Sequence, residues 1–404
     1  MRLGWMRLVA ALAVVLGAAP AFAAETWVST WGAPPDQAGP PLAGRSVRQV
    51  MRVSLGGSRV RLRLSNLYGS APVTIGPVRL ARPDGGAGGS GVRAGTSQAV
   101  TFGGRPVVTI PAGAAVLSDP ADFPVAALEE MAVSLYVSGG AGETTVHGVG
   151  MQTAFTAEGD ATAAARFPKG GVDYGRLFVT DVDVAAAAAA RSIVVIGDSI
   201  TDGVGSADNM NYRWTDALAE RLQADANLRR IAVVNAGIAG NRILNDAAAP
   251  FVGPSMLSRF DRDALDKPGV RWIILLAGVN DISAAGTLPD PKQKVTAEQI
   301  TAGMKTLVDR AHARGLKVYG ATLLPRDGGR FGWEGHQPMR EAVNAWIRTS
   351  GAFDAVIDFE RVVQDPTQPG RLRPAFDSGD HTHPNDAGYA AMAAAVDLGL
   401  FADR

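Results

Sequence analysis

The chain contains no cysteine among its 404 residues. This absence excludes disulfide bonds, zinc–thiolate sites, iron–sulfur clusters and a thiol nucleophile. The folded chain must therefore be stabilised by burial of side chains, and its length is enough for two ordinary domains that each bury a large core.

The chain also lacks net charge. Its 39 basic and 39 acidic residues cancel, so the formal net charge is zero. A neutral chain gives no electrostatic reason to expect nucleic acid or an anionic membrane surface as a partner. We therefore expect no nucleic-acid partner.

The start of the chain has the pattern of an export signal. Arg2 and Arg7 precede an apolar run at 8–16, and the A-F-A sequence at 21–23 has the small residues of a cleavage site. The apolar run is too short to span a bilayer, so it predicts no stable membrane anchor. Residues 1–24 are predicted to be a signal peptide, which would place the mature protein in the periplasm or outside the cell.

Residues 25–184 have the short alternating pattern of β-strands. The segment 59–64 reads R-V-R-L-R-L, so its valine and leucines should face a core and its arginines the solvent. Another alternating run, V-S-L-Y-V, occupies 133–137, and a Gly-Gly pair at 103–104 precedes an apolar run in the manner of a hairpin turn. We predict an all-β sandwich or jelly-roll domain here, followed by an alanine linker at 185–190.

Residues 191–404 change to an alternation of buried strands and amphipathic helices. Thr296 and Gln299 have the spacing of a capping box at the start of one helix. Strands are expected at 193–196, 231–234, 272–276, 316–324 and 355–359, and helices at 212–222, 296–313, 338–348 and 386–398. Five strands that alternate with helices predict a parallel sheet with helices on both faces, and hence right-handed crossovers.

Reactive side chains directly follow the predicted strands, where ligands bind in doubly wound sheets. Ser199, in the G-D-S-I-T-D-G run after the first strand, would be exposed at a strand-to-helix turn, although serine there can also cap a helix. Gly240 follows the second strand and would let a backbone N–H approach a substrate oxygen, or would form an ordinary tight turn. Asn280 follows the third strand and could donate to an oxyanion, or cap a loop.

Two of the five histidines lie just before the last predicted helix. Asp380 and His383 are three residues apart, so one turn of chain can present both side chains to one place. A carboxylate on one ring nitrogen holds a histidine in the tautomer that a general base beside a serine needs. Alternatively, His381 and His383 could ligate a metal, but no third ligand stands at motif spacing.

Other polar residues are interpreted as structural. Asp198 is expected to brace the loop beside the serine, and Asp386 to cap the last helix. His147, His312 and His336 have no partner at motif spacing and are interpreted as ordinary residues.

Together these segments resemble the SGNH (GDSL-type) hydrolase family, whose four signature blocks contribute Ser, Gly, Asn and His. The blocks match at 197–199, at Gly240, at 278–281 and at 380–383. The resemblance covers about residues 191–404 and implies a flavodoxin-like α/β/α sandwich as the catalytic domain.

The resemblance also implies the role of each residue. Ser199 would be the nucleophile and His383 the general base, oriented by Asp380. The backbone N–H groups of Ser199 and Gly240 and the side chain of Asn280 would form the oxyanion hole. No metal and no organic cofactor are implied.

A narrower resemblance includes the N-terminal region. The W-V-S-T-W start at 27–31, the β-domain and the D-H-T-H-P-N-D-A-G-Y run at 380–389 resemble an exported branch of the family that includes xylanase-associated carbohydrate and aryl esterases. This implies a serine esterase that hydrolyses short acyl esters, foremost acetyl groups on a polysaccharide, through an acyl-enzyme. The alternatives are a general aryl- or lipid-ester hydrolase with lysophospholipase-like activity, and a glycan-binding protein with a vestigial esterase domain. Trp27, Trp31 and Tyr68 could stack on sugars or serve as buried anchors.

Overall fold

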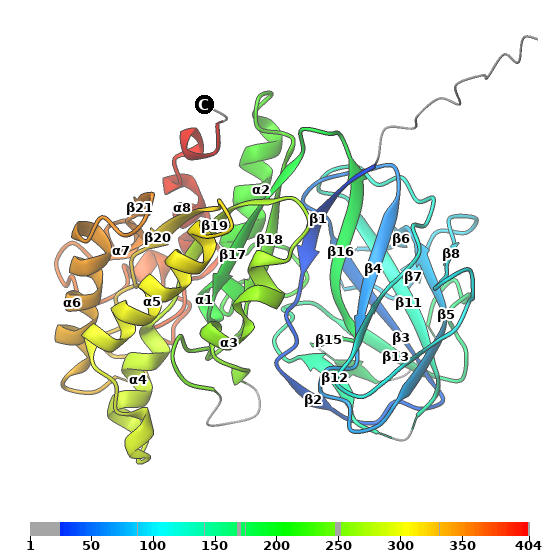
Figure 1. The fold of residues 1–404 in the computed structure, drawn as a ribbon, viewed down its shortest axis with the longest axis horizontal. Helices are drawn as coiled ribbons and strands as arrows, with labels where there is room; N and C mark the ends of the chain where they lie inside the picture. Colours follow the sequence, from blue (N-terminus) through cyan, green and yellow to red (C-terminus); the bar gives the residue numbers. More distant parts are fainter. Residues whose placement is uncertain are drawn as a thin grey trace, which may run out of the picture.

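The structure is a computed structural model that describes residues 25–86, 88–140, 142–167, 171–173, 175–246, 252–330 and 332–402. The predicted signal peptide lies outside the described residues and stays a prediction. The described chain forms an all-β part followed by an α/β part, and the two lie side by side (Figure 1). No helix in the described ranges is long and apolar enough to cross a membrane.

The N-terminal part, here called the β-domain, consists of antiparallel strands. They are β1 (Thr26–Gly32), β2 (Gln37–Gly39), β3 (Arg45–Arg52), β4 (Val60–Ser65), β5 (Val73–Ala81), β6 (Pro83–Asp84), β7 (Gly91–Val92), β8 (Gln98–Val100), β9 (Val108–Ile110), β10 (Ala115–Leu117), β11 (Glu130–Gly139), β12 (Thr144–His147), β13 (Ala154–Glu158), β14 (Val172–Asp173), β15 (Arg176–Leu177) and β16 (Val179–Ala186). The larger sheets have the orders β1-β16-β4-β10, β14-β13-β3-β11-β5-β8 and β15-β12-β2. The prediction of an all-β domain is confirmed.

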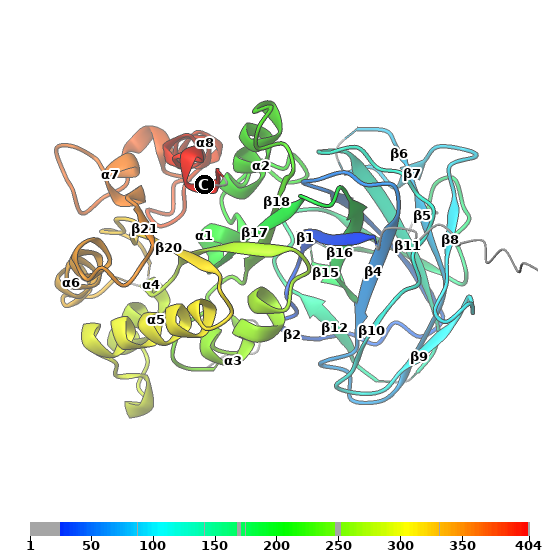
Figure 2. The same cartoon turned by 45° about the horizontal axis from the view of Figure 1, so that its top comes forward.

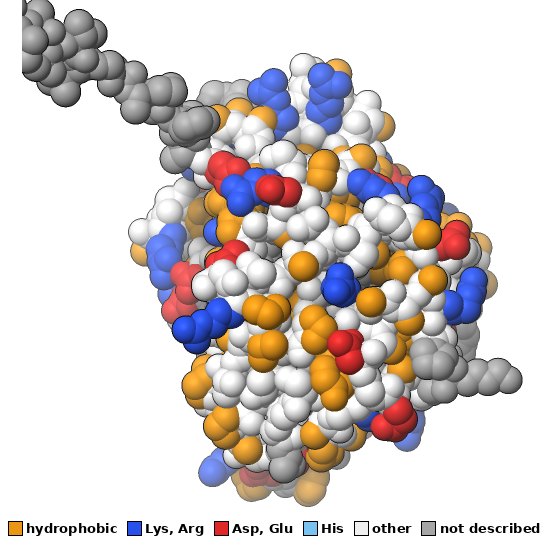
Figure 3. Space-filling model, turned by 90° about the vertical axis from the view of Figure 1, so that its right-hand side faces the viewer, with side chains coloured by type: hydrophobic (Ala, Val, Ile, Leu, Met, Phe, Trp, Pro, Cys, Tyr) orange, Lys and Arg blue, Asp and Glu red, His pale blue; other side chains and the backbone are white. Residues whose placement is uncertain are grey.

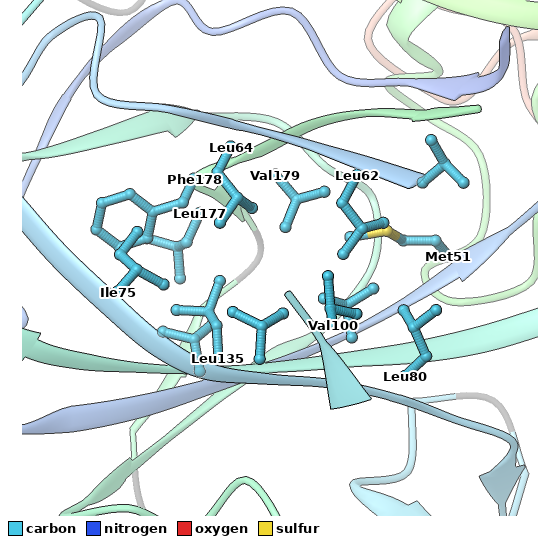
Figure 4. Packing of buried hydrophobic residues seen from close by; sticks show 14 of the residues in the cluster. Met51, Leu62, Leu64, Ile75, Leu80, Val100, Leu135, Leu177, Phe178 and Val179 are labelled. Atoms are coloured by element: carbon cyan, nitrogen blue, oxygen red, sulfur yellow. The ribbon is translucent and has the colours of Figure 1, made fainter. Parts of the chain in front are cut away.

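The alternating pattern of β4 places its apolar side chains in the core of the β-domain. Val60, Leu62 and Leu64 are fully buried, and Figure 4 shows the two leucines among the packed residues. The arginines of this strand do not simply face solvent, so that part of the prediction is wrong. The Arg61 guanidinium lies 2.9 Å from Asp183 on the neighbouring strand β16, because a row of carboxylates stands opposite the row of arginines.

The predicted hairpin turn at 103–104 is confirmed. Phe102 and Arg105 exchange both backbone hydrogen bonds, at 2.8 and 3.2 Å. Both glycines between them have positive φ, 59° at Gly103 and 75° at Gly104. A two-residue turn of this type needs that conformation twice, which explains the glycine pair.

The alanine run is only partly a linker. Strand β16 continues through Ala186, which pairs with Thr26, while Ala185 pairs with Trp27. The prediction is therefore wrong for these two residues, because alanine joins a strand wherever a neighbouring strand offers backbone partners. Residues 187–190 alone connect the β-domain to the next strand.

The C-terminal part, here called the α/β domain, has five parallel strands in the order β18-β17-β19-β20-β21. Its strands are β17 (Arg191–Gly197), β18 (Ile231–Gly237), β19 (Val270–Leu276), β20 (Lys317–Ala321) and β21 (Ala355–Ile357), and its α-helices are α1 (Ser199–Asp202), α2 (Trp214–Ala224), α3 (Met256–Phe260), α4 (Val279–Thr287), α5 (Ala297–His312), α6 (His336–Thr349), α7 (Phe359–Val363) and α8 (Asp386–Ala395). All five expected strands are present, although β20 ends earlier than predicted. The short helices α1, α3, α4 and α7 were not expected.

Two hydrophobic layers cover the sheet, one on each face. Alternate residues of β17 separate them: Val194 and Ile196 pack with α3, α5 and α6, whereas Ile193 and Val195 pack with α2, α7 and α8. Figure 2 shows the helices on either side of the sheet. The capping box of α5 is also confirmed, since Thr296 and Gln299 each accept the backbone N–H of the other. The C-terminal part is thus the expected α/β/α sandwich.

The β-domain packs against the β18 edge of the α/β domain. The Ser29 N–H of β1 donates to the carbonyl of Pro268 at 2.8 Å, and the hydroxyl of Ser54 accepts from Val233 N–H of β18 at 2.9 Å. Lys267 also forms a buried ion pair with Asp181 of β16. The two parts are therefore docked through buried polar contacts.

The opposite face of the β-domain mixes hydrophobic, basic and acidic side chains (Figure 3).

The three aromatic residues that could stack on sugars or serve as buried anchors are half-buried. The Arg61 guanidinium lies over the ring of Trp27 at 4.4 Å from its centroid, and Trp31 packs partly on the core of the β-domain. Tyr68 is held through its backbone N–H, which donates to the Thr145 hydroxyl. These contacts favour anchoring over stacking on a ligand.

Candidate active site

Ser199 is the first residue of α1, two residues after the end of the interior strand β17. The preceding residue, Asp198, is the N-cap: its carboxylate accepts from the Ile200 N–H at 3.0 Å. Asp198 therefore braces the turn, as expected, and Ser199 is not the cap. The Ser199 amide stands at the start of a helix, where a backbone N–H has no acceptor within the helix. Both the hydroxyl and the amide can thus face a reacting group.

His383 connects Ser199 to Asp380. Its Nε2 lies 2.8 Å from Ser199 Oγ, and its Nδ1 lies 2.5 Å from Asp380 Oδ2. The other oxygen of Asp380 accepts the backbone N–H groups of Thr382 and His383, at 2.9 and 2.8 Å. The carboxylate is therefore fixed by its own loop, and the imidazole is fixed by the carboxylate.

The charge state of Asp380 follows from these contacts. Partial burial acts to raise the pKa of Asp380, but the hydrogen bonds from the ring and the backbone of His383 lower it to about 2. An ionised carboxylate on Nδ1 requires the proton on that nitrogen, which leaves Nε2 free to accept a proton from the serine.

His381 does not share a site with His383. Its Nδ1 lies 2.6 Å from Asp377 Oδ2, so each histidine is paired with a different carboxylate. Across the described ranges, no group of three or more His, Cys, Asp or Glu side chains is arranged to hold a metal ion. The pairing explains the two histidines without a metal.

The loop after β18 forms a tight turn with Gly240 at its third position. Asn241 N–H donates to the carbonyl of Ile238 at 3.0 Å, and Gly240 has φ 74°. The preceding amide, of Ala239, donates to Asp202 Oδ2 at 2.9 Å. Among the described residues no acceptor is found for the Gly240 amide itself. The glycine is required by the positive φ at the third position of the turn.

Asn280 lies next to this turn. It is the second residue of α4, and its Nδ2 donates to the carbonyl of Asn241 at 3.2 Å. An amide nitrogen carries two hydrogens, so one remains for another acceptor. The neighbouring Asp281 is buried and accepts from the Ile243 and Leu244 N–H groups, at 2.9 and 3.1 Å. Helix α4 therefore holds the segment that follows the turn.

Arg259 of α3 is a buried residue that sequence reasoning missed. Its guanidinium donates to the carbonyls of Gly197 and Ala236, at 3.1 and 2.9 Å, and to the side chain of Asn241 at 2.9 Å. It also pairs with Asp263 at 3.1 Å. One side chain thus joins the ends of β17 and β18 to the turn. Its helix has only five residues, too few to produce a periodic pattern.

The backbone behind His383 is also held in place. A Cβ at Gly205 would lie 2.7 Å from the carbonyl of Pro384, so the two loops approach too closely for any side chain. The Asp386 carboxylate accepts from Ala207 N–H at 2.8 Å. The prediction that Asp386 caps α8 is wrong: Asn385 is the cap and accepts from Gly388 N–H. Asparagine is as good a cap as aspartate, so residue type alone does not distinguish these two neighbours.

His147 is not an ordinary residue, contrary to the interpretation of the sequence. It lies in β12 of the β-domain, is 4% exposed, and its Nε2 is 3.0 Å from Asp202 Oδ1 of α1. The partners are 55 residues apart and belong to different domains, so no motif spacing could reveal the contact.

The candidate site lies within a part of the chain that matches a known protein family. Residues 195–391 match the model of the GDSL-like Lipase/Acylhydrolase family. All five predicted site residues, Ser199, Gly240, Asn280, Asp380 and His383, fall inside this match. No curated protein matches the chain.

Solved structures resemble about half of the chain. A lipolytic protein of the G-D-S-L family from Desulfitobacterium hafniense is 24% identical, with coverage of 50% of this chain and 96% of that chain and a TM-score of 0.38. The acetylxylan esterase Axe2 from Geobacillus stearothermophilus is 23% identical, with coverage of 52% and 93% and a TM-score of 0.39. A GDSL-like lipase from Bacteroides thetaiotaomicron is 17% identical, with coverage of 52% and 88% and a TM-score of 0.36.

Proposed function

The α/β domain belongs to the GDSL-like lipase/acylhydrolase family and the protein is a carboxylic ester hydrolase; on this premise we propose that it hydrolyses short acyl esters through a Ser199–His383–Asp380 triad. The observation that carries the proposal is the line of two hydrogen bonds, 2.8 Å from Ser199 Oγ to His383 and 2.5 Å from His383 to Asp380. Such a line is the geometry that nucleophilic catalysis by serine needs.

In the proposed acylation step, Ser199 Oγ attacks the ester carbonyl while its proton moves to His383 Nε2. The carbonyl oxygen becomes an oxyanion in the tetrahedral intermediate. When the intermediate collapses, the bond to the alcohol oxygen breaks and His383 returns the proton to that oxygen. Asp380, whose pKa is lowered to about 2, stays ionised and stabilises the imidazolium that forms between the two transfers.

In the proposed deacylation step, the same groups act on water. His383 removes a proton from a water molecule, whose oxygen attacks the acyl carbonyl. Collapse of the second intermediate releases the acid, and the proton returns to Ser199 Oγ. The step consumes one water and regenerates the enzyme without any other reactant.

The oxyanion would be stabilised by the Ser199 and Gly240 amides and by the Asn280 side chain. The amide of Gly240 has no acceptor among the described residues, and Asn280 lies against the same turn. Donors already aimed at the oxyanion need no reorganisation when charge develops, and each typically contributes ~10²–10³ in turnover.

For the substrate we propose an acetyl ester of a carbohydrate. Support comes from the polar character of the loop that carries the triad: Ser378, Asp380 and His381 are exposed around His383. Such a rim suits a hydroxyl-rich alcohol better than a long acyl chain, because hydroxyl groups can hydrogen-bond to it. Export to the periplasm or the medium, where polysaccharides occur, also belongs to this proposal.

The test is a substrate panel. p-Nitrophenyl esters from acetate to palmitate are compared with acetylated xylan, with acetate release as the readout and the Ser199→Ala variant as the blank. We expect the highest kcat/KM on acetate among the aryl esters and acetate release from the xylan. A maximum on long-chain esters would instead make the protein a lipid esterase, and Ser199→Ala with normal activity would reject the triad.

A further inference from the structure

A buried polar cluster connects the β-domain to the turn at 238–241, which carries the Gly240 amide that we propose as an oxyanion donor. His147, at the end of β12, inserts its ring against α1 of the α/β domain. Its Nδ1 lies 2.9 Å from the carbonyl of Pro34, and its Nε2 lies 3.0 Å from the carbonyl of Val149 and 3.0 Å from Asp202 Oδ1. The ring is thus surrounded on both sides by oxygen atoms.

These partners determine the protonation state of the ring. Backbone carbonyls can only accept hydrogen bonds, and one of them faces each ring nitrogen. Both nitrogens of His147 must therefore carry a hydrogen, which makes the ring an imidazolium cation. Burial acts to lower the pKa of His147, but Asp202 and Asp36 beside it raise the pKa to about 9.

The cation is balanced by carboxylates from both domains. Asp202 contributes from α1, and Asp36 of the β-domain lies 3.6 Å from His147 Nδ1. Asp36 also accepts the Gly148 N–H at 2.8 Å, which fixes the backbone just after the histidine. On the other side, Arg213 of the α/β domain donates to the carbonyls of Asp202 and Gly150, at 3.0 and 2.6 Å.

The Asp202 carboxylate connects His147 to the turn at 238–241. Its Oδ1 receives the hydrogen bond from His147, and its Oδ2 accepts the Ala239 N–H at 2.9 Å. Ala239 is the residue before Gly240, so the carboxylate holds the peptide that precedes the proposed oxyanion donor. A Cβ at Gly237 would lie 2.4 Å from the Asp202 backbone nitrogen, so α1 is in direct contact with the end of β18, from which the turn begins.

We propose that His147 is a positioning residue for ester hydrolysis, a cation of the β-domain that fixes Asp202 and thereby the turn carrying the Gly240 amide. The inference rests on the proposed function, because it assigns Gly240 to the oxyanion hole. The β-domain is then part of the catalytic apparatus without touching substrate: it supplies the side chain that sets the angle of one oxyanion donor.

The expected effect follows from the loss of that contact. Without the cation, Asp202 has one buried oxygen that lacks a hydrogen-bond partner, and its side chain shifts to find another. The Ala239 peptide then turns, and the Gly240 N–H no longer points at the oxyanion. Because complete loss of one donor costs ~10²–10³ in turnover, a displaced donor should cost roughly 10–100-fold in kcat.

The experiment compares His147→Gln with His312→Gln in the full chain, on p-nitrophenyl acetate. His312 is a matched control: its Nε2 also lies 2.9 Å from a carboxylate, Asp354, but it is exposed and lies outside the site. We expect kcat to fall roughly 10–100-fold in His147→Gln, with KM within threefold, and no change in His312→Gln. A purely structural role would lower the amount of folded enzyme, not the kcat of the folded fraction determined by active-site titration.

A second variant keeps the test decisive if His147→Gln does not fold. Ala239→Pro removes only the N–H that Asp202 accepts, at the second position of a turn where proline is favoured. It should lower kcat to a similar extent, and where both variants fold, their combination should cost no more than either alone. Multiplying effects, or wild-type kcat in either folded variant while Ser199→Ala is inactive, would overturn the role of His147. An active Ser199→Ala would instead reject the proposed function.

Discussion

His383 Nε2 lies 2.8 Å from Ser199 Oγ although 184 residues separate the two in sequence. The contact forms because β17 delivers the serine to the carboxyl end of the sheet, while the loop before α8 returns the histidine to the same end. Chemistry at this end of a parallel sheet is a property of the fold, since the loops that follow the strands meet there.

Replacement of Ser199 by alanine is predicted to abolish ester hydrolysis by several orders of magnitude while leaving the fold intact. The change removes the nucleophile and only one hydrogen bond. Ser192→Ala is the matched control, because Ser192 is a buried serine at the opposite end of the same strand. Hydrolysis of p-nitrophenyl acetate and circular dichroism of both variants provide the measurement.

Replacement of Asn280 by alanine is predicted to lower kcat by ~10²–10³ and to leave KM nearly unchanged, because its amide would act chiefly once the oxyanion exists. Asn245→Ala is the control: that amide also donates to a backbone carbonyl, of Lys292, but in an exposed loop. Steady-state kinetics decide the outcome. A variant with normal kcat and only a raised KM would move Asn280 from the oxyanion hole to substrate binding.

Replacement of Asp380 by asparagine is predicted to lower kcat by ~10³–10⁴, since an amide can hold His383 in the wrong tautomer. Because the pKa of Asp380 is lowered to about 2 by its contacts with His383, the carboxylate is ionised throughout the working range of an esterase. Its contribution to stability is present above its unfolded pKa near 3.8 and is lost as the pH falls through about 2. Activity profiles from pH 4 upward should therefore show no loss that is due to protonation of Asp380.

The stabilisation from His147 is predicted to disappear in alkali. Its pKa is raised from 6.5 to about 9, with burial opposing and Asp202 and Asp36 causing the rise. A raised pKa stabilises the folded state fully below pH 6.5, and this contribution is lost as the pH rises through about 9. The shift corresponds to at most about 3 kcal/mol.

Urea unfolding at pH 6.5 and at pH 10 measures this effect. The difference in unfolding free energy between the wild type and His147→Gln should be large at the lower pH and small at the higher. An equal difference at both values would mean that the ring is neutral in the folded protein.

Replacement of Arg259 by methionine is predicted to destabilise the protein by roughly 3–5 kcal/mol, because it leaves buried Asp263 with less compensation and removes a hydrogen-bond donor from each of three acceptors. Arg314→Met is the control, since its ion pair with Asp266 at 3.1 Å is exposed and such pairs contribute about 0–1 kcal/mol. Equilibrium unfolding of both variants should show the contrast. Equal losses would mean that burial of Arg259 is not what matters.

The features that could be predicted from the sequence are those that depend on residues close together in the chain. Local chemistry was enough to predict three features that the structure contains. They are the strand at 193–196, the capping box at Thr296 and the turn at the glycine pair 103–104. The candidate site was found in the same way, because each of its blocks directly follows a strand or precedes the last helix.

What could not be predicted depends on contacts across the molecule. The positive charge of His147 is stabilised by Asp202 and Asp36, which lie far from it in sequence. No pattern in the residues next to His147 predicts either contact. Arg259 is stabilised by carbonyls at the ends of two strands, and carbonyls have no sequence signature. The cap of α8 was predicted at Asp386 instead of Asn385 because both residue types suit a helix N-terminus and only packing distinguishes them.

Strand β1 has a consequence for the order in which the chain folds. Thr26 pairs with Ala186 and Gly32 with Asp181, so the first strand of the described chain receives its partner only when the β-domain is almost complete. Its Ser29 also needs Pro268, which is made later still. Pairing of residues so far apart in sequence is slow, and an apolar strand is prone to associate with other chains until it is paired. Pairing of β1 is therefore a late step in the assembly of the β-domain, and chaperones that hold the nascent amino-terminal segment should raise the yield of active enzyme.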